Sequence, residues 1–328
     1  MTVLSRLLSS ASLRLASRRV ALLLVTLLLV SVITFGIMQV LPGNIINALL
    51  GDTATLDQIA ALQHRMGFDT PLPVRYWNWI SRVLQGDLGI SQQYGIPVSS
   101  MLSGRVFNSL VLGLLALVVS VPLALALGTL GALHRGRRLD RFITALVLVN
   151  FGLPEYVLGV LAILVFSVWF PLLPGSSLVA PGENPLARPL AMVLPVLVLS
   201  AGLLTYISQI TRTGMIRALQ SPYVRTAVLK GLPMRVVVLR HALPNVMLPV
   251  LAEIGMHFGY VIGGLVVVET LFSYAGVGQM LMNAVTYRDV VALQGTVLVI
   301  AAAYGVGNMA ADLIALRFDP RIEDGAAR

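Results

Sequence analysis

The chain of 328 residues is strongly apolar, since 57% of its residues are hydrophobic and only 11% are charged. Soluble domains carry about 25% charged residues, so this composition predicts a polytopic membrane protein. The absence of cysteine excludes disulfides and a catalytic thiolate, and the four histidines have no metal-ligand spacing. Neither a GxxxxGKS/T phosphate loop nor a GxSxG motif occurs. The chain is therefore expected to have no catalytic residue, metal or bound cofactor, and not to hydrolyse ATP by itself.

Six apolar segments reach the length of about 20 residues that a membrane-spanning helix requires. They predict an all-α fold with six transmembrane helices. Pro122, Pro154, Pro195 and Pro249 lie inside these segments, where neighbouring helices can satisfy the backbone groups that a kink frees. The predicted spans are 20–41, 106–133, 142–169, 190–211, 242–271 and 290–311.

Arginine and lysine are distributed unevenly between the two sides of these spans. One side holds 17 of the 23 Arg and Lys residues. Because cytoplasmic loops collect these residues, the N-terminal segment 1–19, the segment 212–241 and the C-terminal tail 312–328 are predicted to be cytoplasmic. The same bias explains the net charge of +9 without nucleic acid as a partner. The first apolar run is longer than the roughly 7–15 residues of a signal peptide, which predicts an uncleaved first span.

The segment 42–105, between the first two spans, is too long for a simple connection and is predicted to be an extracytoplasmic helical segment. Its sequence predicts one helix over 55–67, opened by a capping box, and a second helix from Pro73 to about Gly86. The two tryptophans of the second helix suit a membrane interface. Two interpretations remain open, a structural cap on the outer face and a docking surface for a partner.

The stretch 223–244, YVRTAVLKGLPMRVVVLRHALP, interrupts the apolar sequence with five basic residues and no acidic residue. Ser221 followed by a proline is a favourable helix start, with the serine as N-cap. Gly231 is expected to end this helix, and Pro233 to begin a second short helix over 234–241 that continues into the fifth span. The basic residues alternate with Val and Leu, so the stretch is amphipathic. It fits either a helix lying on lipid headgroups or a docking element for a soluble partner.

The spacing within this stretch resembles the signature of permease subunits of binding-protein-dependent ABC importers, which reads EAA, three residues, Gly, nine residues and then I-x-L-P. Here Arg225-Thr226-Ala227, Gly231 and the sequence His-Ala-Leu243-Pro244 have that spacing. The form YVRTA…KGL…RHAL.N is typical of the dipeptide and oligopeptide branch. Other blocks similar to that branch are LPGN at 41–44, MGFDTPLPVRYWNWI at 66–80, GDLGIS at 86–91, VVVETLFSYAGVGQML at 266–281, YRDV at 287–290 and FDPRI at 318–322.

The resemblance covers about residues 20–322 and identifies the chain as a member of this family. The long outer segment with its GDLG resembles the first of the two permease paralogues of the branch. The chain departs from the branch at Ala275 and Pro222, and at Glu155, Glu253 and His257, where small or neutral residues are common. Arg225 departs only from the general signature, which has a glutamate there.

The resemblance implies a type I importer permease in the bacterial inner membrane. It implies four kinds of partner, namely a second homologous permease, two ATP-binding subunits that hold ATP and Mg²⁺, an extracytoplasmic solute-binding protein and membrane lipid. The expected cargo is a di- or oligopeptide or a peptide-like solute, while nickel, glutathione and an opine or sugar-type solute remain open. A secondary transporter driven by an ion gradient is the alternative from a different class.

In such permeases the EAA stretch is the coupling helix, which sits in a groove of the ATP-binding subunit. The residues to which the resemblance assigns ATPase coupling here are Tyr223, Arg225, Thr226, Ala227, Gly231, Leu243 and Pro244.

Glu155, Glu253 and His257 are ionisable residues within predicted spans. A charge at mid-membrane costs about 2.5–3.5 kcal/mol on insertion scales, so these side chains are expected to face the bundle. Glu253 and His257 are four residues apart and suit a pair on one helical face. They form either a structural pair or part of a polar translocation path for a zwitterionic or cationic solute. Glu269, near the outer end of the fifth span, is expected to brace packing.

Overall fold

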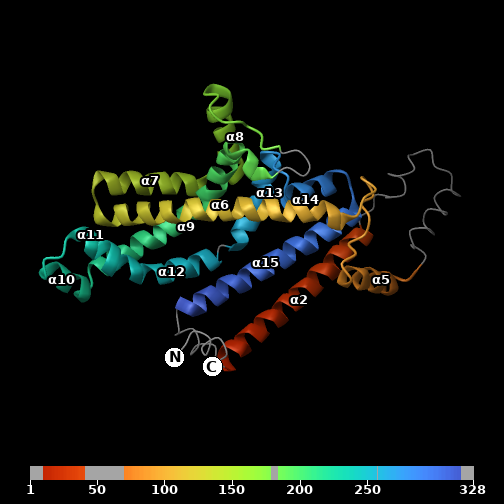
Figure 1. The fold of residues 1–328 in the computed structure, drawn as a ribbon, viewed down its shortest axis with the longest axis horizontal. Helices are drawn as coiled ribbons and strands as arrows, with labels where there is room; N and C mark the ends of the chain where they lie inside the picture. The colour runs from red at the N-terminus through yellow and green to blue at the C-terminus, as the bar shows by residue number, and fades with distance from the viewer. Residues whose placement is uncertain (1–9, 41–69, 179–183, 257, 319–328) are drawn as a thin grey trace.

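The computed structural model describes residues 10–40, 70–178, 184–256 and 258–318. Within these ranges the regular elements are helices, and several long ones run along the molecule (Figure 1). Five of the described helices are long and apolar enough to cross a membrane, or six if one bent pair is a single span. In chain order the elements are α2 (Ser10–Val40), α5 (Leu72–Leu84), α6 (Val98–Leu133), α7 (Arg138–Gly152), α8 (Glu155–Ile163), the π-helical η1 (Leu164–Trp169), the 3-10 turn η2 (Pro185–Ala187), α9 (Pro189–Leu219), α10 (Pro222–Leu229), α11 (Met234–Val236), the π-helical η3 (Val237–Ala242), α12 (Leu243–Met256), α13 (Phe258–Leu271), α14 (Val277–Thr286) and α15 (Val290–Phe318).

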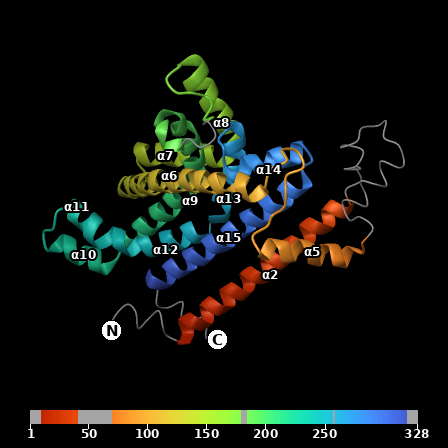
Figure 2. The ribbon, with the colours of Figure 1, turned by 45° about the vertical axis from the view of Figure 1, so that its right-hand side comes forward.

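The centre of the bundle is the long contact between α6 and α9 (Figures 1 and 2). α6 buries a row of small residues spaced by four, Ala116, Ser120, Ala124 and Gly128. Small residues let membrane helices approach closely, which replaces the hydrophobic driving force that lipid does not supply. The approach is tightest at Gly128, where an added Cβ would lie 2.6 Å from the carbonyl oxygen of Ser208. This pair of helices forms the support on which α7, α8 and α12 are placed.

α5 is an amphipathic helix packed against α2 at the side of the bundle (Figure 2). The ring of Phe35 in α2 lies 5.4 Å from that of Tyr76 and 5.7 Å from that of Trp79, while Trp77 is exposed. The prediction of a helix from Pro73 to about Gly86 is confirmed to within two residues at each end. The predicted helix over 55–67 lies outside the described residues.

The third predicted span, 142–169, consists of two helices rather than one, because the pair α7 and α8–η1 is bent by 106°. The bend follows from Pro154, since the residue before a proline is forced out of the helical region and Leu153 is extended, with φ −99° and ψ 123°. The Nδ2 atom of Asn150 donates to the carbonyl oxygen of Ala201 and to the hydroxyl of Thr205, at 2.5 and 2.7 Å. These bonds hold the end of α7 on α9. Beyond the bend, α8 runs roughly perpendicular to α7 (Figure 1).

The fifth predicted span contains α12 and α13, and a buried glutamate, Glu269, lies near the end of α13. Glu269 accepts hydrogen bonds from the Ser109 hydroxyl at 2.5 Å and from the backbone N–H groups of Gly278 and Gln279 at 2.7 and 3.2 Å. The backbone of Gly276 closes on this carboxylate, since an added Cβ would lie 2.2 Å from it. The expectation that Glu269 braces packing is confirmed, because it joins α13 to α6 and α14.

Candidate coupling segment and polar cleft

The predicted helix, glycine turn and second helix are present between α9 and α12. α10 ends at Leu229, and Gly231 has a φ of +78°. The Gly231 N–H donates to the carbonyl oxygen of Val228 at 2.9 Å, and the Leu232 N–H donates to that of Ala227 at 3.3 Å. An added Cβ on Gly231 would meet nothing within 4 Å, so its backbone angle and not space favours glycine here.

Ser221 occupies the N-cap position of α10, but the predicted side-chain cap is absent. Its hydroxyl donates instead to the carbonyl oxygen of Ala218 at 2.5 Å. The reason is that α9 ends only two residues earlier, at Leu219, and the last carbonyl groups of a helix have no partner within it. The serine therefore serves the end of α9 rather than the start of α10.

The second short helix, predicted over 234–241, is mostly π-helical and continues into α12 without a break. Pro244 supplies a physical reason, because it has no N–H and its ring crowds the carbonyl group four residues earlier, at Arg240. A π-helical turn widens the helix and relieves that contact. Leu243 and Pro244 thus belong to one helical rod with η3.

The inner face of α10 packs on this rod. Val224 and Ala227 are buried in the same apolar cluster as Val237, Val238 and Ala242 of η3.

A polar tie crosses the same junction. The Nδ2 atom of Asn245, in α12, donates to the Tyr223 hydroxyl at 3.2 Å and to the carbonyl oxygen of His241 at 2.8 Å. Asn245 ends the block RHAL.N of the sequence, but no role was predicted for it. Its contact with Tyr223 joins the start of α10 to the start of α12, so α10, η3 and α12 form one packed unit.

The outer face of α10 and the turn after it are exposed. This face mixes apolar and basic side chains, and Leu229 is 79% exposed although it is a large apolar residue. Among the predicted coupling residues, Tyr223, Arg225, Thr226 and Gly231 are exposed, whereas Ala227 is buried. We call this face the coupling surface, and its members are Arg225, Val228, Leu229, Lys230, Leu232 and Met234.

An ion pair near the coupling segment was not predicted. The Nε and Nη2 atoms of Arg212 donate to the two carboxylate oxygens of Asp140 at 2.7 and 2.8 Å, and the Gly136 N–H donates to the same carboxylate at 2.8 Å. This bidentate geometry is the strong form of a carboxylate–guanidinium contact. It fixes the first turn of α7 against α9. The two residues are 72 positions apart, so no local pattern in the sequence indicates the pair.

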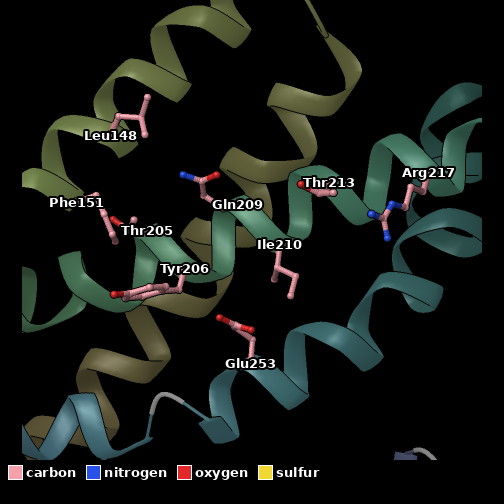
Figure 3. A pocket seen from close by; sticks show the side chains of 9 residues that line it. All are labelled: Leu148, Phe151, Thr205, Tyr206, Gln209, Ile210, Thr213, Arg217 and Glu253. Carbon is pink, nitrogen blue, oxygen red and sulfur yellow. The ribbon is translucent and has the colours of Figure 1, made fainter.

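A polar cleft lies over α9, between α7 and α12 (Figure 3). Its volume is about 480 Å³. α9 forms its floor, the apolar side chains of α7 form one wall, and the Glu253 carboxylate points from α12 towards α9 on the opposite side (Figure 3). It is lined by Leu148, Phe151, Thr205, Tyr206, Gln209, Ile210, Thr213, Arg217 and Glu253.

The three candidate path residues do not form one cluster among the described residues. Glu253 lines the cleft, whereas Glu155 begins α8 and its carboxylate packs against α13, within 2.7–2.8 Å of where a Cβ on Gly264 would lie. His257 lies outside the described residues. No group of three or more His, Asp or Glu residues in the described ranges is placed to hold a metal ion.

Comparison with known protein families shows which family this chain belongs to. The family described as binding-protein-dependent transport system inner membrane component matches residues 120–324, and the family for the N-terminal part of such membrane components matches residues 12–127. The chain is a binding-protein-dependent transport permease. The resemblance predicted from the spacing around Gly231 is confirmed.

The permease has relatives along most of its length. It is 32% identical over 294 residues to a probable peptide ABC transporter permease of Sinorhizobium fredii, with 89% of this chain and 93% of that protein covered. It is 34% identical over 299 residues to a putative peptide permease of Brucella suis, with the same coverage. It is also 32% identical over 294 residues to a glutathione transport system permease of Salmonella typhimurium, with 89% and 92% covered.

Membership places the permease in the inner membrane as a non-catalytic subunit of an ABC importer. Its family implies no cofactor on this chain, and it implies an ATPase and a solute-binding protein as partners.

Proposed function

We propose that this permease forms the pore of an importer that moves di- or oligopeptides or peptide-like solutes into the bacterial cell. Separate subunits hydrolyse the ATP. The observation that carries the proposal is the coupling surface, an exposed basic and apolar face on a helix that packs firmly on α12. The peptide cargo is supported by relatives named as peptide and glutathione permeases.

The complete importer in this proposal contains a second homologous permease, two ATP-binding subunits and an extracytoplasmic binding protein. Both termini face the cytoplasm, on the side of the coupling surface. The geometry supports this orientation, because the start of α7, with its neighbouring arginines, lies at the same end of the molecule as α10 and α11 (Figure 1). The positive-inside rule places such basic ends in the cytoplasm.

ATP-driven motion enters the permease through α10. The ATP-binding subunit holds the coupling surface, with Arg225 of that surface and the neighbouring Tyr223 and Thr226 at the contact and Gly231 at the turn. Because α10, η3 and α12 are joined by buried contacts and by the bond between Tyr223 and Asn245, closure of the ATPase pair moves them together. Packed units of this kind move as bodies and switch between two arrangements. The movement of α12 carries Glu253 with it and alternates access to the pore.

The function is tested in proteoliposomes that contain both permeases and the ATP-binding subunits, with binding protein outside. Uptake of radiolabelled trialanine is expected to require ATP inside and binding protein outside, and to persist with a protonophore. Liposomes without binding protein are the control. Uptake that continues without ATP and stops with the protonophore would establish an ion-gradient-driven transporter instead. ATP-dependent uptake of nickel or an opine without uptake of peptides would support an ABC importer but contradict the peptide cargo.

A further inference from the structure

The floor of the cleft carries a polar stripe on an otherwise apolar helix. Gln209, Thr213 and Arg217 are exposed and follow one another at intervals of four residues, so they lie on one face of α9. The same helix has a window apolar enough to span a membrane, and 67% of that window is buried. Gln209 lies within the predicted span 190–211, where polar groups face a bundle interior or a water-filled path rather than lipid, and Thr213 and Arg217 continue its face beyond the cytoplasmic end of that span.

The cleft also contains charges of opposite sign. Glu253 projects from α12 at the level of Tyr206 and Ile210, and Arg217 projects from α9 towards the α12 side (Figure 3). Arg217 is seven residues beyond Ile210 and eleven beyond Tyr206, which is about 10 and 16 Å along a helix. A tripeptide backbone spans about 10 Å at most, because each extended residue covers about 3.3–3.6 Å. The two charges thus lie at different levels along α9, as the oppositely charged ends of a short peptide require.

The other residues that line the cleft suit the peptide groups and the side chains of a short peptide. Gln209 and Thr213 supply both donors and acceptors for peptide groups. Leu148 and Phe151, on α7, supply an apolar wall for side chains (Figure 3). The volume of about 480 Å³ is within the range of small-molecule sites, about 300–1,000 Å³.

We propose that this cleft is a binding subsite for a zwitterionic di- or tripeptide. Glu253 binds the terminal ammonium group, Arg217 binds the terminal carboxylate, and Gln209 and Thr213 bind the peptide groups between them. The subsite rests on the proposed function and adds to it, since it makes this subunit itself selective for both peptide termini. A helix of the second permease is the competing occupant of the same cleft, and the test separates the two.

The permease has no cysteine, so Gln209→Cys introduces the one thiol of this chain. The whole importer is placed in nanodiscs without nucleotide and treated with a charged, membrane-impermeant thiol reagent, and modification of this chain is measured by mass spectrometry. Modification is expected, and trialanine at about ten times its dissociation constant is expected to slow it about tenfold, because about one site in eleven stays empty. Trialanine with an acetylated N-terminus and an amidated C-terminus is expected to protect at least about tenfold less well, having lost its charge-assisted hydrogen bonds.

Ser99→Cys is the control, because Ser99 is exposed, lies outside the predicted spans and does not line the cleft. It is expected to give no protection by trialanine. Two further variants, each combined with Gln209→Cys, assign the charges. Glu253→Gln is expected to abolish the effect of N-acetylation while keeping that of C-amidation, and Arg217→Gln is expected to do the reverse.

Two outcomes overturn the subsite. In the first, the thiol at position 209 stays unmodified, as it would beneath a helix of the second permease. In the second, free and capped trialanine protect equally. Uptake of trialanine by the unmodified importer is measured separately. If that uptake is normal and protection is absent, the subsite fails while the proposed function stands, whereas failure of uptake for every peptide tested removes the function itself.

Discussion

Individual residues of α10 divide between two faces with different tasks. Val224 and Ala227 are buried and hold α10 on η3, whereas Arg225 and Leu229 are exposed. Substitutions at exposed positions usually change the free energy of unfolding by less than about 0.5 kcal/mol. Changes on the outer face are therefore expected to alter coupling to the ATPase without altering folding.

Arg225→Glu is expected to reduce peptide uptake by about tenfold or more, which corresponds to about 1.4 kcal/mol lost at the ATPase contact. The amount of assembled permease in the membrane is expected to stay unchanged. Uptake and binding-protein-stimulated ATP hydrolysis in proteoliposomes measure the effect, and Arg225→Lys, which keeps the charge, is the control. Normal stimulated hydrolysis in the glutamate variant would show that Arg225 has no part in coupling.

Gly231→Pro is expected to uncouple transport from ATP hydrolysis while leaving membrane insertion intact. Proline fixes φ near −65°, whereas Gly231 has a φ of +78° and donates its N–H to Val228. Gly231→Asn is the control, because asparagine tolerates positive φ better than other residues with a side chain. Equal ratios of uptake to ATP hydrolysis in the proline and asparagine variants would contradict the role of the turn.

At the scale of the helices, a few polar contacts hold α7 in position on α9. α7 is held to α9 at one end by the pair of Asp140 and Arg212 and at the other end by Asn150. The apolar wall of the cleft lies on α7, so these contacts also set the width of the cleft. In the proposed mechanism, α7 therefore keeps its place when α12 moves on the opposite side of the cleft.

Asp140→Ala is expected to lower the free energy of unfolding by about 1–3 kcal/mol, because it leaves the Arg212 guanidinium without its bidentate partner. The value is reduced from that of a fully buried pair, since the Arg212 side chain is 31% exposed. The measurement is the thermal unfolding midpoint of the purified importer. In the exchanged variant, Asp140→Arg with Arg212→Asp, part of the lost stability is expected to return. Equal unfolding midpoints for Asp140→Ala and the parent would contradict a stabilising role of the ion pair.

At the scale of the whole molecule, the contact between α6 and α9 supports everything else. The two helices approach closely because the residues at their contact are small, so the fold is expected to be most sensitive to substitutions that enlarge these residues, above all Gly128. α2 and α15 pack together on one flank, and α8 projects from the other (Figures 1 and 2).

Gly128→Ala is expected to destabilise the permease by about 1–3 kcal/mol, as overpacking in a tight contact does. The added Cβ would lie 2.6 Å from a backbone oxygen and 2.7 Å from the Cβ of Thr211. Gly113→Ala, in the same helix, is the control, because its nearest neighbour would be 3.8 Å away. The yield of monodisperse protein and its unfolding midpoint are compared, and equal values for the two variants would contradict the tight crossing.

The sequence predicted features that depend on local or periodic patterns. Apolar length indicated the helical fold, and Gly231 indicated the turn because one residue type suits that backbone angle. The size of the bend at Pro154 was not predicted and the predicted N-cap role of Ser221 is wrong, because each depends on what the neighbouring helix offers.

The cleft itself was not predicted, and Glu253 is the residue of its lining that the sequence singled out. Arg217 falls in the segment 212–241, which was predicted to be cytoplasmic. The site requires α7, α9 and α12 to meet, and no local pattern specifies which faces of three helices meet.

The π-helical turn of η3 maintains the angular phase between the two ends of the rod that contains it. Each residue of an α-helix advances the direction of its side chains by about 100°. A π-helical turn holds about one residue more than an α-helical turn, so removing one residue within 237–242 would let η3 become α-helical and leave Glu253 pointing across the cleft. Removing one residue from the α-helical part of α12 before Glu253 would instead turn this carboxylate away by about 100°. The wide turn is therefore the place in the rod where a change of one residue in length leaves the direction of α12 unchanged.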